Sequence, residues 1–221
     1  GLIRVLPDEV VVWNEAQASE ARLLHGVPPD RIMVTGAQTF DRWFAMRPSR
    51  SREDFCRRAG LDPERRYLLY TGSSVFSAPE EVPFAERWLL ALRQSDVPRV
   101  AALGALFRPH PANARQWHTF DRSSFPNAAI WPPIGTDPNS PGFKEDFFDS
   151  VYYSDGVVGI NTSAQIEASI VGRPVFTVRS PEFAHGQEGT LHFRHLVDGR
   201  GAVRAAASLD EHVRQLAPLL D

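Results

Sequence analysis

The feature that most constrains the fold is a regular alternation of short apolar runs and amphipathic segments, which begins at Tyr67 and continues through the rest of the sequence. The runs are apolar throughout rather than at every second residue, which indicates strands buried on both faces. Helix-length segments separate them, so the strands are expected to be parallel. We therefore predict an α/β fold: a Rossmann-like, doubly wound parallel sheet of about six strands. The predicted strands are 67–71, 99–107, 128–131, 156–160, 174–178 and 201–205, and the predicted helices are 79–94, 112–120, 143–154, 163–171 and 209–220.

The sequence before Tyr67 has a different organisation. Two β-branched runs, 9–13 and 31–35, flank a helical pattern that Asn14 can cap, and a polar, arginine-rich stretch follows. We predict that 1–46 is the end of an N-terminal domain with its crossover, that 47–65 is a linker with one short helix, and that 66–221 is the Rossmann-like domain. The sequence opens without a methionine and close to a strand, so we expect it to be part of a longer protein.

Composition excludes several classes of protein. The net charge of −3 and the pI near 6.2 argue against nonspecific nucleic-acid binding. The single cysteine, Cys56, rules out an internal disulfide and suits a reducing cytosol. No stretch is apolar over a membrane-spanning length, and no signal peptide is visible.

In open α/β sheets, ligands bind beyond the carboxyl ends of the strands, so the residues that follow each strand are the candidates for a site. The strand at 67–71 is followed by Gly72, Ser73 and Ser74. The glycine allows close backbone approach and the serines offer hydroxyl donors, which suits a phosphate or a sugar hydroxyl. A plain glycine–serine turn explains the same residues.

The next strand ends in the sequence Arg-Pro-His-Pro, residues 108–111. Each proline favours extended backbone in the residue before it, so His110 is held in a stiff segment at the strand end. An imidazole fixed there can donate to a phosphate or act as acid or base, and Arg108 adds a cation if it faces the same way. The alternative is that the prolines only end the strand.

The most informative stretch is "GINTSAQIEASIVGRPVFTV", residues 159–178. Asn161, Thr162 and Ser163 cluster where a helix begins, which favours an anion site. Glu167 lies about one turn into that helix, where a carboxylate suits a ribose diol. A capped core helix is the alternative. Near the C-terminus, His185, His192 and His195 fall in a segment that we expect to be a polar loop, and we predict no metal site there.

The order of these motifs resembles the C-terminal, donor-binding domain of GT-B-type glycosyltransferases, over roughly residues 60–221. Within that group it is most similar to enzymes of capsule, teichoic-acid and lipopolysaccharide assembly with an R-x-H-P element, including CDP-glycerol glycerophosphotransferase-like and Kdo-transferase-like proteins. It is also similar to the non-hydrolysing UDP-N-acetylglucosamine 2-epimerases. It departs from the epimerases at Ser73 and Ser74, where they carry a histidine–arginine pair, and "NTSA" stands where CDP-glycerol transferases usually show "DYSS".

The resemblance implies a role for each motif. His110 would contact the donor phosphate and act in catalysis, Asn161, Thr162 and Ser163 would form the phosphate loop, and Glu167 would bind the ribose. Arg108, Gly72, Ser73 and Ser74 are the other expected donor-binding residues. The general base would come from the N-terminal domain.

We therefore expect transfer of a sugar or alditol phosphate from a CMP-, CDP- or UDP-linked donor to a glycan or lipid-linked acceptor, in surface polysaccharide or glycoconjugate synthesis. No cofactor and no metal are expected, and the expected location is cytoplasmic or peripheral at the inner membrane face. Two alternatives are a 2-epimerase-like isomerase and a non-catalytic nucleotide-binding scaffold.

Overall fold

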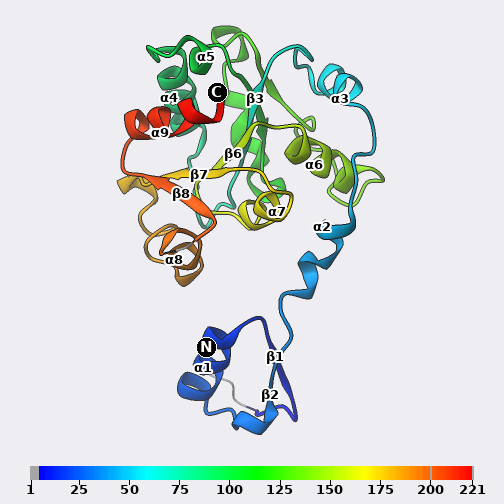
Figure 1. Ribbon diagram of the computed structural model, residues 1–221, viewed down its shortest axis with the longest axis vertical. Coiled ribbons are helices and arrows are strands. Elements are labelled where there is room, and N and C mark those ends of the chain that lie inside the picture. Colours follow the sequence, from blue (N-terminus) through cyan, green and yellow to red (C-terminus); the bar gives the residue numbers. More distant parts are fainter. Residues whose placement is uncertain (1–4, 200, 221) are drawn as a thin grey trace. The chain divides into compact units, whose positions relative to one another are not determined.

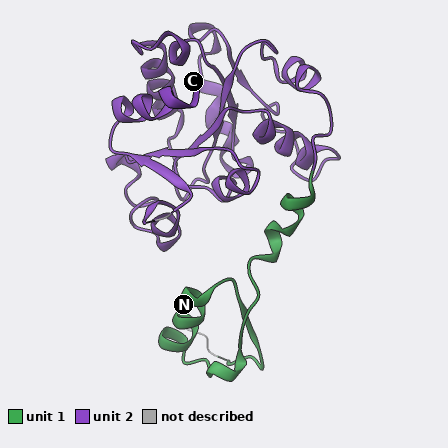
Figure 2. Cartoon of the chain, in the orientation of Figure 1, with its two compact units in different colours: residues 1–46 green, residues 47–221 purple. Residues whose placement is uncertain are grey.

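The computed structural model describes residues 5–199 and 201–220, and the chain divides into two compact units, residues 1–46 and 47–221 (Figure 2). The first unit has a pair of parallel strands, β1 (Val10–Val12) and β2 (Ile32–Val34), joined by helix α1 (Glu15–His25). Asn14 caps α1 by accepting a hydrogen bond from the backbone N–H of Gln17, as its position in the sequence predicts. Two short helical segments, η1 (Pro29–Arg31) and η2 (Gln38–Phe40), and helix α2 (Asp41–Ala45) complete the unit.

The second unit is built on a six-stranded sheet in the order β5-β4-β3-β6-β7-β8, and all five strand pairings are parallel (Figure 1). This confirms the predicted fold class. The strands are β3 (Tyr67–Thr71), β4 (Gly104–Arg108), β5 (Ala128–Ile130), β6 (Gly156–Gly159), β7 (Val175–Val178) and β8 (Val203–Ala206). The helices are α3 (Arg52–Ala59), α4 (Val82–Arg93), α5 (Pro98–Ala101), α6 (Phe143–Tyr152), α7 (Ala164–Ile170), α8 (Leu191–Val197) and α9 (Leu209–Leu216), with shorter segments η3 (Pro111–Thr119), η4 (Arg122–Ser124), η5 (Pro181–Phe183) and η6 (Ala217–Leu220).

The strand order reverses between β3 and β6. From β3 the chain moves outward through β4 to β5, then returns to pair β6 with the other side of β3 and moves outward through β7 to β8. The last residue of β3, Thr71, stands in register with Arg108 of β4 and with Gly159 of β6. Crevices for ligands form at such a reversal, beyond the carboxyl ends of the strands.

Both faces of the sheet are buried, which explains why the strands are apolar throughout. Along β3, Leu68 and Tyr70 pack into a core with α4, η3 and α9, whereas Tyr67 and Leu69 pack into a second core with α3, α6 and α7. Successive side chains of a strand point to opposite faces, so a strand covered on both sides needs apolar residues at every position.

The stretch 47–65, expected to be a linker, is instead part of the second unit. Its helix α3 buries Phe55, Cys56 and Ala59 against the sheet, while Arg57 and Arg58 stay at the surface. Ser49 donates from its backbone N–H and its hydroxyl to the buried carboxylate of Asp149, at 2.8 and 2.6 Å. The segment was expected to be a linker because most of its residues are charged or polar. The three apolar residues that α3 buries lie on one face of the helix, and their packing against the sheet is enough to hold the segment in the second unit.

Three further segments differ from the predictions. The strand expected at 99–107 begins only at Gly104, because Pro98 starts a helical turn, α5, before it. The helix expected at 112–120 is the 3₁₀ segment η3. The expected polar loop around His192 and His195 contains helix α8, which buries Phe193 and Leu196 and is capped by the side chain of Thr190.

Candidate functional site

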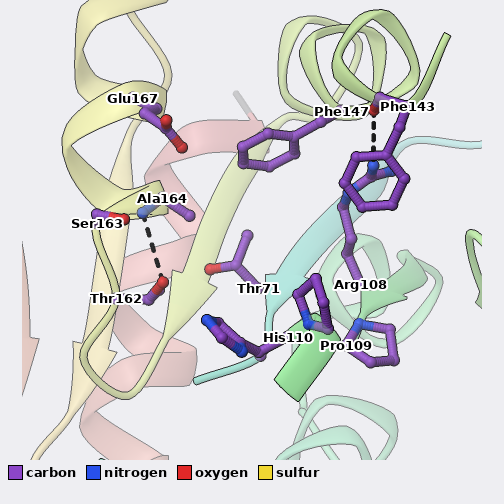
Figure 3. A pocket seen from close by; sticks show the side chains of 12 residues that line it. Thr71, Arg108, Pro109, His110, Phe143, Phe147, Thr162, Ser163, Ala164 and Glu167 are labelled. Carbon is purple, nitrogen blue, oxygen red and sulfur yellow. Dashed lines mark hydrogen bonds between the residues drawn. The ribbon is translucent and has the colours of Figure 1, made fainter. Parts of the chain in front are cut away.

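A pocket of about 140 Å³ opens at the reversal of the strand order (Figure 3). Four segments that are distant in the sequence meet there: the ends of β3 and β4, the start of α6, and the turn from β6 into α7. A cavity of this size holds one group as large as an aromatic ring or a phosphate, so a larger ligand would extend beyond it. The lining residues are Thr71, Gly72, Arg108, Pro109, His110, Pro111, Phe143, Phe147, Thr162, Ser163, Ala164 and Glu167.

His110 points into this pocket from the end of β4 (Figure 3). Its backbone is extended, with φ −66° and ψ 131°, as expected for a residue before a proline. Its Nδ1 accepts a hydrogen bond of 3.2 Å from the backbone N–H of Ala112. Burial lowers the pKa of His110 below its usual value, so the ring is neutral at pH 7. Because Nδ1 is the acceptor, the proton lies on Nε2, which can donate to a ligand.

Arg108 is a buried cation beside His110. Its guanidinium carbon lies 4.9 Å from the ring centre of Phe143 and 5.0 Å from that of Phe147, and its Nη2 donates to the carbonyl oxygen of Phe143 at 3.1 Å (Figure 3). Nη1 is buried with no hydrogen-bond partner among the described residues. Burial lowers the pKa of Arg108 to about 10, and the charge of Asp146 acts in the opposite direction. The side chain remains charged at pH 7, and an unpaired buried donor of this kind suits an anion.

The two aromatic residues that hold Arg108, Phe143 and Phe147, were not among the expected site residues. They are four residues apart and therefore lie on one face of α6. That spacing was the available signal, but the same spacing is typical of ordinary core packing.

Thr162, Ser163 and Glu167 line the side of the pocket opposite α6 (Figure 3). The hydroxyl of Thr162 accepts a long hydrogen bond, 3.4 Å, from the backbone N–H of Ala164. Ser163 stands at the start of α7 without capping it through its side chain. Two hydroxyls and a carboxylate on this side face a cation and an imidazole on the other.

Three of the expected donor-binding residues, Ser73, Ser74 and Asn161, do not line the pocket. Ser73 is fully buried below it. The side-chain amide of Asn161 points to another loop, where it donates to the carbonyl oxygen of Gly186 at 2.6 Å. The sequence placed these residues at the correct strand ends but could not give the direction of their side chains.

Ser73 connects the loops that carry the site. Its backbone N–H donates to the carboxylate of Glu81, at 2.9 and 3.2 Å, and its hydroxyl accepts from the backbone N–H of Asn161 at 3.3 Å. Its carbonyl oxygen accepts from the side chain of Asn113, in the segment that follows His110, at 3.1 Å. One residue thus joins the loops after β3, β4 and β6.

Glu81 is a buried acid beneath the site. The hydroxyl of Tyr70 donates to its Oε1 at 3.1 Å, in addition to the N–H of Ser73. Burial raises the pKa of Glu81 to about 8, and the hydrogen bonds from Ser73 and Tyr70 only partly oppose this effect. The side chain is therefore largely protonated near neutral pH in the folded protein.

Gly72 allows the backbones of two site loops to approach closely. Its N–H donates to the carbonyl oxygen of Arg108 at 2.9 Å, and a Cβ at this position would lie 2.8 Å from the backbone nitrogen of His110. Because the obstructing atoms belong to the backbone, a Gly72→Ala variant must displace the His110 loop.

We expect the Gly72→Ala variant to lose about 1–3 kcal/mol of unfolding free energy, the usual range for overpacking. Chemical denaturation followed by circular dichroism measures the loss. Ser74→Ala is the matched control, since its hydroxyl makes no hydrogen bond with any described residue, and it should change stability by less than about 0.5 kcal/mol. Equal stability of Gly72→Ala and wild type would contradict the prediction.

Within residues 5–199 and 201–220, no three histidine, cysteine, aspartate or glutamate side chains are grouped so that they could hold a metal ion. Among the helices of that same part of the chain, none has both the length and the apolar character that crossing a bilayer requires.

Comparison with known proteins gives matches only among solved structures. No protein-family model and no curated protein sequence matches the chain. UDP-GlcNAc 2-epimerase from Methanocaldococcus jannaschii is similar with a TM-score of 0.61 and 14% identity, over 97% of this chain and 55% of the epimerase. The glycosyltransferase WaaG, described as involved in lipopolysaccharide biosynthesis, has a TM-score of 0.53 and 17% identity over 96% and 53% of the two chains. A variant of the wall teichoic acid polymerase TagF has a TM-score of 0.52 and 14% identity over 96% and 49%.

These structures share the GT-B-like fold, and the expected resemblance to it is confirmed. The six-stranded parallel sheet of this chain is a Rossmann-like half of that fold. The chain spans about half the length of the solved structures that it matches. At these identities the likeness establishes the fold, and the reaction has to be argued from the site.

Proposed function

We propose that this chain binds the nucleotide-activated donor of a GT-B-type transferase, which moves a sugar or an alditol phosphate to an acceptor hydroxyl. The observation that carries the proposal is the pairing of a buried arginine with a neutral histidine in a phosphate-sized pocket at the reversal of the strand order. Structures of similar fold support it: the epimerase of Methanocaldococcus jannaschii was solved in complex with UDP-GlcNAc and UDP.

In the proposed reaction, the bond that breaks joins the transferred group to a phosphate oxygen of the nucleotide. That oxygen leaves with the electron pair, and negative charge develops on it. Arg108 supplies a fixed positive charge, and the Nε2–H of His110 supplies a hydrogen-bond donor. Groups already oriented toward a developing charge stabilise the transition state without reorganisation.

The acceptor hydroxyl forms the new bond and loses its proton to a base. The resemblance assigns that base to the N-terminal domain of a GT-B enzyme. Glu167, Thr162 and Ser163 line the other side of the pocket. We expect Glu167 to accept hydrogen bonds from the ribose hydroxyls, and Thr162 and Ser163 to donate from their hydroxyls to phosphate oxygens.

Isothermal titration calorimetry with CMP, CDP, UDP and GDP tests the proposal. We expect one nucleotide to bind at least about tenfold more tightly than the others, a difference of about 1.4 kcal/mol. If none of the four binds to the folded protein, the proposal is wrong.

The same titrations, together with an NMR assay of the sugar, distinguish the transferase from the isomerase alternative. A 2-epimerase-like protein would prefer UDP and would scramble the configuration at C2 of UDP-N-acetylglucosamine without any acceptor, which NMR of the sugar detects. The serines at positions 73 and 74, where those epimerases carry histidine and arginine, favour the transferase.

A further inference from the structure

A second hollow, of about 510 Å³, lies beyond the carboxyl end of the edge strand β5. We call it the edge groove. Arg58 from α3, His118 from η3, Arg122 from η4 and Trp131 just after β5 line it, together with apolar residues that include Ile130 and Ile134. Its volume is within the range of pockets that bind small ligands.

The two charged side chains that line the edge groove, those of Arg58 and Arg122, are both positive. None of its described lining residues carries a carboxylate, although the whole chain has a net charge of −3. The guanidinium of Arg122 has no ion pair or hydrogen bond with any described residue, and that of Arg58 lies 3.8 Å from Asp146 while its side chain is 56% exposed. The groove therefore favours an anion.

The position of Arg58 is held by an aromatic ring. Its guanidinium carbon lies 5.2 Å from the ring centre of Trp131, an arrangement that orients the cation and leaves its N–H groups available. The indole N–H of Trp131 is itself buried without a hydrogen-bond partner among the described residues. The groove thus combines one oriented cation, a second exposed cation, an unpaired donor and an apolar wall.

The edge groove lies near the pocket of His110, with a third hollow between them. A hollow of about 260 Å³ between them shares Pro133 and Ile134 with the edge groove, and shares Pro109, Pro111 and Phe143 with the pocket. A molecule in the groove can therefore extend along the carboxyl ends of β5 and β4 to the site where we propose the donor to react.

We propose that the edge groove binds a phosphate-bearing part of the acceptor and so guides it toward His110. The identification of the ligand as the acceptor rests on the proposed function, whereas the anion site itself rests on the groove. Arginines recognise phosphate oxygens with paired N–H groups, and the flanking apolar surface suits the carbon chain between successive phosphates.

Inorganic tripolyphosphate, a soluble chain of phosphates, is the probe. Calorimetry and tryptophan fluorescence measure its binding, and a Trp131→Phe variant identifies the part of the signal that comes from Trp131, one of two tryptophans that line the groove. We expect the double variant Arg58→Gln/Arg122→Gln to bind tripolyphosphate at least about tenfold more weakly, because it loses two charge-assisted contacts. The control Arg57→Gln/Arg115→Gln makes the same change in net charge outside the groove and should bind within about twofold of wild type.

The groove and the donor pocket can be tested separately. Tripolyphosphate should still bind when the donor pocket is saturated with the nucleotide that binds best, and the groove variant should leave nucleotide binding unchanged. Equal binding of tripolyphosphate by wild type and the groove variant, or no binding at all, overturns the proposal even if a nucleotide binds. Binding to vesicles that contain phosphatidic acid, without binding to tripolyphosphate, would identify a membrane surface instead and also overturn it.

Discussion

Replacing His110 with asparagine is expected to weaken nucleotide binding by about ten- to hundredfold, because a hydrogen bond to a charged group contributes about 1.5–3 kcal/mol. Asparagine can keep an acceptor near the position of Nδ1, so the N–H of Ala112 retains its partner. What it loses is the Nε2–H that points into the pocket. The variant therefore tests the contact with the ligand rather than the shape of the loop.

Calorimetry with the nucleotide that binds best to wild type measures this effect. His110→Gln is the matched variant, since its longer side chain can bring an amide N–H near the position of Nε2, and it should recover part of the affinity. Both variants should unfold within about 0.5 kcal/mol of wild type. Unchanged nucleotide affinity in a folded His110→Asn protein would remove His110 from the proposed site.

The sheet could be predicted from the sequence because its signal is local. In a strand such as Tyr67–Thr71, covered on both faces, every position is buried and the first four residues are apolar, and that pattern is visible without any partner. The edge strand β5 follows the same logic, whereas α9 shows the one-sided apolar pattern of an amphipathic helix. Segment 47–65 could not be assigned in this way, because three apolar residues, including Phe55, decide its position among many charged ones.

The site could be predicted only in part. Arg108, His110, Thr162, Ser163 and Glu167 all line one pocket, because the carboxyl ends of parallel strands meet at one edge of the sheet. This argument gives the location of a residue but not the direction of its side chain.

The residues whose part in the site was not predicted from the sequence are positioned by contacts between distant segments of the chain. Phe143 reaches Arg108 from a helix that follows a different strand, and Ser73 turns inward because Glu81 accepts its N–H from below. A glutamate near the start of a predicted helix is usually at the surface, so nothing in the sequence marks Glu81 as buried.

Glu81 gives the second large effect, a dependence of stability on pH that a Glu81→Gln variant should remove. The folded protein holds the pKa of Glu81 at about 8, against 4.5 for an exposed glutamate. Between these values the folded state keeps a proton that the unfolded state has released. The contribution to stability is therefore complete below about pH 4.5, decreases as the pH rises through 8, and does not change further above that.

The expected loss is about 1.4 kcal/mol per pH unit within this window, or a few kcal/mol in total. Urea unfolding at intervals from pH 5 to pH 9 measures it, as the difference in unfolding free energy between wild type and Glu81→Gln. Contributions from other titrating groups, such as the buried His212, whose pKa burial lowers to about 4, cancel in that difference.

Glutamine has nearly the shape of the protonated acid, so its carbonyl oxygen can still accept from the N–H of Ser73 and its amide can donate to the oxygen of Tyr70. Wild type and variant should therefore be similar in stability near pH 5, and the variant should be the more stable protein at pH 8 and above.

Nucleotide affinity measured for the same two proteins shows whether ionisation of Glu81 affects the pocket through Ser73. Wild type should lose affinity above pH 8 and the variant should not. A difference in unfolding free energy that stays constant from pH 5 to pH 9 would mean that Glu81 is already ionised in the folded protein, and that its three hydrogen bonds from Ser73 and Tyr70 outweigh the cost of its burial.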